Sequence, residues 1–225
     1  MRVCIHQPQF IPYLGFFNKV AQCDTYVILD DVKGTKGDFT NRNRIKDPSG
    51  QIWLTIPVKS KNTLIKDMKI SMTDYPWAKK HLKSIYFNYI KAPYFDSFFS
   101  DIEKICNEKK WEKIIDIDIE FIRWCFKILK IDVKMIISSD LDVKSSKSQK
   151  LVDICKKVGA DSYLSGVGGK NYLDSNLFNK EGIKVEFQDF KHPIYPQLFG
   201  EFIPNLSIID MILNCGDRSR NFLGV

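Results

Sequence analysis

The stretch MRVCIHQPQFIPYLGFFNKVAQCDTYVILDD, residues 1–31, decides the fold class. It opens on a short apolar run that ends in polar residues and a proline, a pattern typical of a buried strand leading into a loop. Residues 15–21 fit a helix, and the β-branched and aromatic run TYVILDD, residues 25–31, predicts a second strand. Strand, helix and strand in this order form a βαβ unit, whose crossover implies two parallel strands.

The rest of the chain repeats this alternation on both sides of a long helical pattern. Residues 74–131 are predicted to be helical, and residues 145–160 to form a helix capped by serine. The sheet strands that we expect are Arg2 to His6, Thr25 to Asp30, Ile52 to Val58, Val133 to Ile137, Asp161 to Leu164 and Lys184 to Phe187, with a short further strand in Ile65 to Ile70. We therefore expect an α/β fold with a mainly parallel, Rossmann-like sheet and a helical insertion.

The same pattern predicts how the chain is divided. Residues 1–73 and 132–225 are expected to form the two halves of one α/β domain, with residues 74–131 as the helical insertion. The segment 32–50 is rich in Gly, Asn, Asp and Lys and poor in apolar residues, which predicts an exposed loop. The final segment, residues 217–225, is typical of a frayed end.

The composition is that of a globular protein with a basic surface. The 225 residues include 34 Lys or Arg and 27 Asp or Glu; the formal net charge of +7 suggests an acidic partner, with the lysine-rich composition of an AT-rich genome as the alternative. The six cysteines form no C-x-x-C pair or Cys/His cluster, which argues against a structural metal and predicts free thiols in a reducing compartment. Neither a signal-peptide pattern nor an apolar run of about 18 residues occurs, so we expect no membrane span and a cytoplasmic location.

Polar residues at predicted strand ends are the candidates for chemistry, because parallel sheets bind ligands beyond the carboxyl ends of their strands. His6 is the candidate general base, with a satisfied buried histidine as the alternative. Gln7 and Gln9 flank it as candidate substrate-binding residues. Asp31 is the second catalytic candidate and Asp30 a binding one; either carboxylate suits Mg²⁺ or a substrate amine, or else caps the loop or is solvated.

Two further segments suit anionic ligands. Asn41, Arg42 and Arg44 lie in the predicted loop, where guanidinium groups grip phosphate or carboxylate in a bidentate manner; solvated loop charge is the alternative. The turn SGVGGKNYLD, residues 165–174, places glycines after a strand, which allows backbone amides to approach a phosphate. The candidates from this turn and from a later proline-marked loop are Ser165, Gly168, Gly169, Lys170, Tyr172 and His192.

Several ordered motifs together resemble the WbqC-like family over essentially the whole chain. These motifs are HQPQFIPYLGFFNKVAQCDTYVILDDV at 6–32, NRNRI at 41–45, WLTIPV at 53–58, SSKSQKLVDICKKVGADSYLSGVGGKNYLD at 145–174 and HPIYPQLFGEFIPNLSIIDMILNCG at 192–216. The family is associated with bacterial surface-polysaccharide and O-antigen clusters. The resemblance implies an enzyme that transfers glycine, another aminoacyl group or another acyl group to an amino sugar.

That resemblance sets the expected partners and reaction. We expect an N-acyl or aminoacyltransferase, or an ATP-dependent amide ligase, acting on a nucleotide-linked amino sugar. The acyl donor is left open between ATP with Mg²⁺ and a free amino acid, an aminoacyl-tRNA, and an acyl thioester. His6 is the expected base, and the backbone amides of Gly168 or Gly169 are the expected oxyanion donors.

A looser similarity concerns nucleotidyltransferases such as pantothenate synthetase. Phe10, Pro12 and Gly15 fit an F-x-P-x-x-G outline at a helix start, although the paired histidines of an H-x-G-H signature are absent. The rival functions are therefore a nucleotidyltransferase-like ATP-dependent ligase of another product, and a nucleic-acid or partner-binding module. One cleft at the carboxyl strand ends is expected to hold His6, Gln7, Asp31, Asn41, Arg42, Gly168, Gly169, Lys170 and Tyr172.

Overall fold

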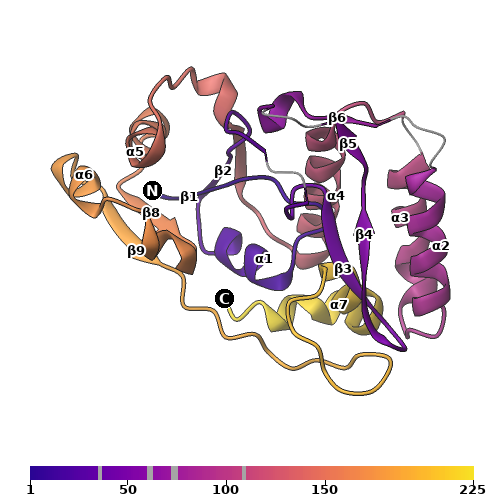
Figure 1. Cartoon of the computed structure of the whole chain (residues 1–225). Helices are drawn as coiled ribbons and strands as arrows, with labels where there is room; N and C mark the ends of the chain where they lie inside the picture. The colour runs from indigo at the N-terminus through magenta and orange to yellow at the C-terminus, as the bar shows by residue number, and fades with distance from the viewer. Residues whose placement is uncertain (35–36, 60–62, 72–75, 108–109) are drawn as a thin grey trace.

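A five-stranded parallel sheet forms the centre of the computed structural model, which describes residues 1–34, 37–59, 63–71, 76–107 and 110–225 (Figure 1). The strand order is β7-β2-β1-β8-β9. Every pairing in this sheet is parallel, which confirms the α/β, Rossmann-like expectation. The strands are β1 (Arg2–His6), β2 (Thr25–Ile28), β7 (Lys134–Ile137), β8 (Ser162–Ser165) and β9 (Lys184–Phe187).

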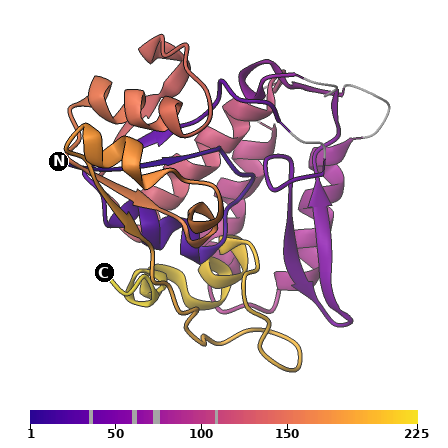
Figure 2. The same ribbon diagram turned by 60° about the vertical axis from the view of Figure 1, so that its left-hand side comes forward.

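Helices cover both faces of this sheet, as the two ribbon views show (Figures 1 and 2). Alternate residues of a strand point to opposite faces, so Cys4 joins one hydrophobic cluster while Val3 and Ile5 join the other. The first cluster contains side chains of helices α1 (Leu14–Ala21), α4 (Ile114–Leu129) and α7 (Ile208–Cys215). Helices α5 (Lys147–Val158) and α6 (Ser175–Lys180) supply the second.

The strand order reverses at β1, which pairs with β2 on one side and β8 on the other. The chain leaves β1 into α1 on one face of the sheet, and it leaves β8 toward α6 on the opposite face. Such a reversal opens a crevice beyond the carboxyl ends of the two strands, where open α/β sheets bind their ligands. The ends of β1 and β8 are therefore the place to look for a site.

Three helices fill the segment predicted to be helical: α2 (Trp77–Tyr89), α3 (Phe95–Asn107) and α4. The expected domain boundary between residues 73 and 74 lies outside the described residues, and the division into domains stays a prediction. Within the described ranges, no helix combines the length and apolarity that crossing a bilayer requires. All six cysteines are buried and free.

The expectations for residues 32–70 need correction. Segment 52–58 does not join the parallel sheet, and segment 32–50 is not simply a loop, because the chain builds an antiparallel hairpin there. Asn43 and Ile45 point inward and are fully buried, so a mostly polar stretch forms a strand through contacts made elsewhere in the fold. The elements are β3 (Arg42–Asp47), β4 (Gly50–Thr55), β5 (Val58–Lys59), a 3₁₀ turn (Ile65–Asp67) and β6 (Lys69–Ile70), of which β5 and β6 pair antiparallel.

The chain end is ordered rather than frayed, which is a second correction. Residues Gly216–Phe222 form a 3₁₀ helix, and Leu223 after it is fully buried. The Asn18 side chain of α1 donates to the Leu223 carbonyl at 2.7 Å, and Arg220 donates to the carbonyl that ends α4 at 2.7 Å. These bonds satisfy backbone carbonyls and hold the chain end against α1 and α4.

Candidate active site at the sheet edge

A cavity of about 560 Å³ opens where the sheet predicts a site, beyond the end of β1. We call it the sheet-edge cavity; its lining residues are Ile5, His6, Gln7, Leu29, Val32, Lys147, Ser148, Lys150, Leu151, Tyr163 and Tyr172. Its volume falls within the range of small-molecule pockets. Of the expected site residues, it brings together His6, Gln7 and Tyr172.

The first turn of α5 forms one wall of the sheet-edge cavity. Ser146 caps the helix with extended backbone but makes no side-chain cap bond, so the helix N-terminus is not closed by its own cap. Lys147 adopts a left-handed φ of 53°, which costs a non-glycine residue about 1 to 2 kcal/mol. An exposed cation and a helix N-terminus together suit an anion. Sequence reasoning missed this wall because it searched only strand ends.

Ser148 ties the same turn to the segment after β8. Its hydroxyl donates to the Tyr172 carbonyl at 3.3 Å and accepts from the Asp174 backbone N–H at 3.1 Å. These bonds hold the start of α5 against the segment that carries Tyr172, whose ring is 67% exposed at the cavity. The two walls of the cavity are therefore fixed to each other.

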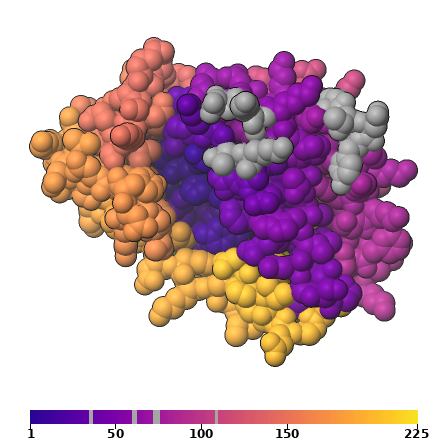
Figure 3. Space-filling view, viewed as in Figure 1, coloured from indigo at the N-terminus to yellow at the C-terminus, as the bar shows by residue number. Residues whose placement is uncertain are grey.

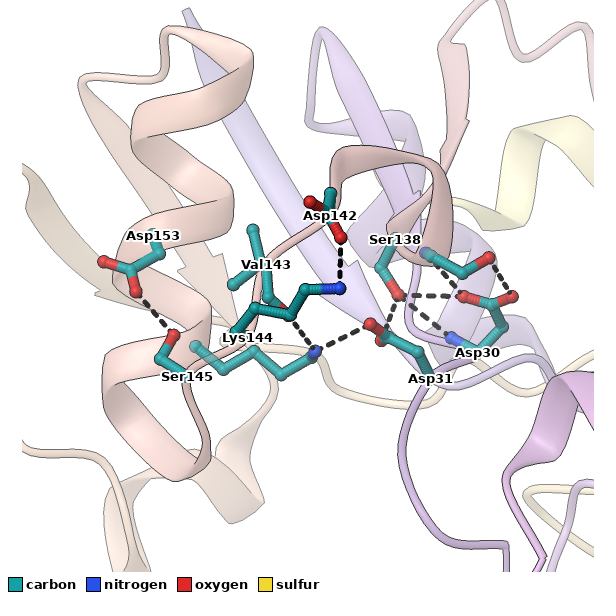
Figure 4. Close-up of polar contacts among 10 residues, drawn as sticks. Asp30, Asp31, Ser138, Asp142, Val143, Lys144, Ser145 and Asp153 are labelled. Carbon is teal, nitrogen blue, oxygen red and sulfur yellow. Dashed lines mark hydrogen bonds and ion pairs between the residues drawn. The ribbon is translucent and has the colours of Figure 1, made fainter.

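Asp31 acts on the cavity through Lys150. The Lys150 ammonium donates to the Asp31 carboxylate at 2.7 Å and to the Val143 carbonyl at 3.2 Å (Figure 4). Burial by itself raises the pKa of Asp31, but the hydrogen bonds from Lys150 and Ser138 outweigh it and hold that pKa below its usual value. Asp31 is therefore ionised at neutral pH and is the charge partner of a cavity-lining lysine.

Asp30 is held by serines rather than facing open space. Its carboxylate accepts from the Ser139 N–H and hydroxyl at 2.9 and 2.8 Å and lies 2.9 Å from the Ser138 hydroxyl, which donates its one proton to the closer Asp31 carboxylate at 2.6 Å (Figure 4). These bonds join the end of β2 to the turn after β7. The carboxylates of Asp30 and Asp31 are thus already bonded to hydroxyls and to Lys150, and a Mg²⁺ ion held there together with substrate phosphates stays a prediction. Among the described residues, no group of three or more metal-ligating side chains occurs.

His6 is a neutral histidine with one free nitrogen. Its Nδ1 lies 2.8 Å from the Gln7 carbonyl, which can only accept, so Nδ1 carries the proton and Nε2 keeps its lone pair. Burial lowers the pKa of His6 to about 3, and the nearby Lys19 ammonium adds to that effect. The ring packs edge-on against Phe16 at 5.4 Å between centroids. His6 can accept a hydrogen bond, and a bound anion beside it would raise its pKa.

The glycine turn after β8 is a packing feature more than an anion cradle. The Gly169 N–H donates to the Gly166 carbonyl at 2.9 Å, which corrects its assignment as a free oxyanion donor. A Cβ at Gly169 would lie 2.1 Å from the Ser165 hydroxyl oxygen, so close packing requires this glycine. A Cβ at Gly168 would meet no other atom within 4 Å. The Lys170 ammonium nitrogen lies 5.6 Å from the centroid of the Phe187 ring. Ser165 itself is buried and bonds the Gly166 carbonyl.

The remaining candidates lie outside the sheet-edge cavity, so the single expected cleft is divided. Asn41 is buried and structural: its Nδ2 donates to the Ile56 carbonyl at 2.8 Å. Arg44 and Gln9 line a second cavity of about 420 Å³, and Arg42 lies beside it over the Trp53 ring. His192 packs among aromatic rings of the C-terminal loop, with Nδ1 bonded to the next carbonyl.

Comparisons with known proteins identify the family. The model of the WbqC-like protein family matches residues 7–222. An uncharacterized protein of Mycobacterium tuberculosis (strain ATCC 25618 / H37Rv) is 31% identical over 226 residues, covering 99% of this chain and 97% of that protein. No solved structure matches the chain. Apart from Ile5 and His6, the residues that line the two cavities lie within the matched region, and the chain belongs to the WbqC-like protein family.

Proposed function

We propose that this protein is an enzyme that forms an amide on a nucleotide-linked amino sugar during surface-glycan assembly. The observation that carries the proposal is the sheet-edge cavity, which joins a neutral histidine, a lysine paired with aspartate and an open helix N-terminus at the strand-order reversal. The family resemblance supplies the reaction class. The cavity supplies groups suited to that class.

Charge and volume favour a phosphate-bearing ligand. Lys147 and the N-terminus of α5 present positive charge to the cavity, and Lys147 has no partner among the described residues. A cavity of about 560 Å³ has room for a small molecule of nucleotide-sugar type. In this proposal the phosphates lie against the start of α5 and the amino sugar lies toward His6.

The chemistry balances with His6 as the proton acceptor. The substrate amine attacks the acyl carbon, a C–N bond forms, and the bond from that carbon to the donor's oxygen or sulfur breaks. His6 Nε2 takes the proton released by the amine and returns it to the leaving group. The glycine turn does not supply the oxyanion donor in this proposal, since the Gly169 N–H is already used and Gly168 does not line the sheet-edge cavity. A phosphate held beside Lys147 would raise the low pKa of His6 and make it a stronger base.

The acyl donor is tested by supplying each class in turn. Purified protein is incubated with amino-sugar nucleotides and with an amino acid plus ATP and Mg²⁺, an aminoacyl-tRNA, or an acyl thioester, and products are read by mass spectrometry. The expected result is the mass gain of one acyl group on the sugar nucleotide with one donor class. No mass gain with any donor would contradict the proposal. Pyrophosphate release without an amide product would favour the nucleotidyltransferase-like ligase instead.

A further inference from the structure

A second cavity lies on the hairpin side of the molecule, where three separate segments meet. We call it the hairpin cavity; it measures about 420 Å³ and is lined by Gln9, Tyr13, Phe39, Arg44 and Asn205. Gln9 stands two residues after Gln7, which lines the sheet-edge cavity, so one loop connects the two. In the space-filling view, the indigo N-terminal segment is set back between the orange and salmon C-terminal part and the purple hairpin part (Figure 3).

Arginine and aromatic side chains share the outward face of the hairpin. Arg42 lies over the Trp53 ring with its guanidinium carbon 4.2 Å from the ring centroid, and Arg44 lies at 5.4 Å. Phe39 packs beside Trp53 with centroids 6.1 Å apart. Phe39 is 36% exposed and Trp53 is 45% exposed, so both rings are open to solvent on this face. The face therefore offers planar surfaces and positive charge together.

Several polar groups at this face lack partners. The Nε atoms of Arg42 and Arg44 and the Oε1 atom of Gln9 are buried without a hydrogen bond. Arg44 makes a long contact of 3.5 Å to the Asn205 carbonyl. Within the described part of the chain, neither arginine forms an ion pair with a carboxylate. Buried polar groups without partners need an explanation, and a bound ligand supplies one.

The loop that floors the hairpin cavity is held in a strained shape. Ile11 has a φ of 40°, which is an outlier for a β-branched residue. Asn43, fully buried in β3, fixes this conformation: its Nδ2 donates to the Phe10 carbonyl at 3.1 Å and to the Ile11 carbonyl at 2.8 Å. Strain of this kind persists where the surroundings enforce it, and it clusters at ligand sites. Gln9 and Tyr13 are thereby presented on either side of a rigid bend.

We propose that the hairpin cavity is a nucleotide-binding subsite in which Arg44 holds a phosphate and Phe39, backed by Trp53, stacks on the base. Guanidinium suits phosphate, and bases stack on aromatic rings and on guanidinium planes. Gln9 lines the cavity and its buried Oε1 has no partner, so a rotation of this side chain would offer an acceptor to an N–H on the base edge. This assignment adds a separate place for a nucleotide and does not depend on the amide-forming reaction.

The test measures nucleotide binding by titration calorimetry without any acyl donor. Wild-type protein is titrated with UDP, GDP and ADP, with inorganic pyrophosphate, with uridine, and with a five-nucleotide single-stranded RNA. We expect at least one nucleoside diphosphate to bind more tightly than pyrophosphate or the nucleoside alone, because base and phosphate are both recognised. If no nucleoside diphosphate binds, or if RNA binds and nucleoside diphosphates do not, the assignment is wrong.

Four matched variants locate the binding site. Arg44→Gln should weaken nucleoside diphosphate binding at the hairpin cavity about 10- to 100-fold, as expected for a lost charged hydrogen bond, and should leave any binding at the sheet-edge cavity unchanged. Phe39→Ala should weaken it by roughly 5- to 100-fold through lost stacking. Arg218→Gln and Phe87→Ala are the controls, because Arg218 also lies over a ring, that of Tyr94, and Phe87 is 65% exposed on α2. Both controls should bind like the wild type.

A fifth variant separates this inference from the proposed function. Lys147→Gln alters the sheet-edge cavity alone, so it should leave binding at the hairpin cavity intact. Binding that is lost in Lys147→Gln and kept in Arg44→Gln would move the nucleotide to the sheet edge and overturn the inference. Normal nucleotide binding without any amide product would instead contradict the proposed function. Circular dichroism of each variant confirms that it folds.

Discussion

The two cavities differ in how their cations are balanced. At the sheet edge, the buried cation Lys150 forms an ion pair with Asp31, the two side chains being only 9% and 12% exposed, while the exposed Lys147 has no partner among the described residues. On the hairpin, Arg42 and Arg44 lie over an aromatic ring and form no ion pair among the described residues. A cation with an internal partner is already oriented and adds little new attraction for a ligand. A cation without an internal partner can form its ion pair with a bound ligand.

This contrast suggests a division of labour. The sheet-edge cavity has the features of a place for chemistry, with a neutral base candidate and positioned charges on rigid elements. The hairpin cavity has the features of a place for recognition, with stacking surfaces and unsatisfied donors. Substitutions at the sheet edge should therefore change turnover, and substitutions at the hairpin should change ligand affinity.

The largest expected effect is on turnover at the sheet edge. His6→Gln should lower kcat for amide formation by about 10²- to 10⁴-fold, because glutamine fills the space but cannot take the proton. The matched control is His192→Gln, since His192 also bonds the carbonyl of the next residue through Nδ1 at 2.8 Å. Initial rates at saturating substrate measure both. Equal losses in the two variants would remove the assigned role of His6.

The next effect concerns the stability of the paired charges. Lys150→Met should lower the free energy of unfolding by about 2 to 3 kcal/mol, because it leaves the Asp31 carboxylate mostly buried without its cation. Lys156→Met is the control: its partner Glu181 is 39% exposed, so the cost should stay below about 1 kcal/mol. Urea denaturation measures both variants.

A double variant checks the cause of that loss. Adding Asp31→Asn to Lys150→Met removes the uncompensated charge and should recover part of the lost stability. If the double variant is as unstable as the sum of the two single variants, the residues act independently and the ion pair is not the cause.

A smaller effect is expected at the bend between the two cavities. Asn43→Ala should cost about 2 kcal/mol of unfolding free energy, since it leaves the Phe10 and Ile11 carbonyls without their donor. Asn88→Ala is the control, because the Asn88 amide bonds only one helical carbonyl in the described chain, that of Ser84, and its loss should stay within about 0.5 kcal/mol. Thermal and urea unfolding compare the two. A negligible cost at Asn43 would show that the bend is not held by this amide.

The parallel sheet could be predicted from the sequence because its strands are short apolar runs bounded by polar residues. The hairpin could not be predicted, because β3 presents only one apolar side chain, Ile45, and its other central inward residue is a polar Asn43 satisfied by distant carbonyls. Whether such a stretch becomes a strand depends on groups some 30 residues away in sequence. No local pattern carries that information.

The candidate site, like the fold, could be predicted only in part from the sequence. Strand-end reasoning found His6 and Gln7, because the end of β1 lies at the reversal of strand order. It missed Lys147 and Lys150, which come from the start of a helix and reach the same edge only through the fold. The KSQK spacing places these two lysines on one helix face, a signal that a search of helix starts would have used.

The two regions also differ in a histidine whose pKa is lowered, half-buried His6 at the sheet edge and buried His81 behind the hairpin. Burial lowers the pKa of His6 to about 3 at the sheet edge. It lowers the pKa of His81 to about 4 behind the hairpin, where Nε2 lies 3.1 Å from the Thr55 carbonyl of β4. In the unfolded chain both have the ordinary value of 6.5. Below pH 6.5, the two histidines therefore bind protons in the unfolded state but stay neutral in the folded state.

The smallest expected effect is the decrease in unfolding free energy that each histidine causes when the pH is lowered slightly. Stability from both groups is fully present above pH 6.5 and falls as the pH drops toward 4 and then 3. Between pH 7 and pH 5.5, each should cost about 1 kcal/mol of unfolding free energy. His6→Gln and His81→Phe should each flatten that decline by the same amount, and the double variant by about twice as much, because the two sites lie in separate regions and should be additive. Urea denaturation at the two pH values measures this.

An unchanged pH dependence in either single variant would mean that its histidine binds protons as readily in the folded protein as in the unfolded chain. For His6, that result would also remove the neutral base on which the proposed chemistry of the sheet-edge cavity depends.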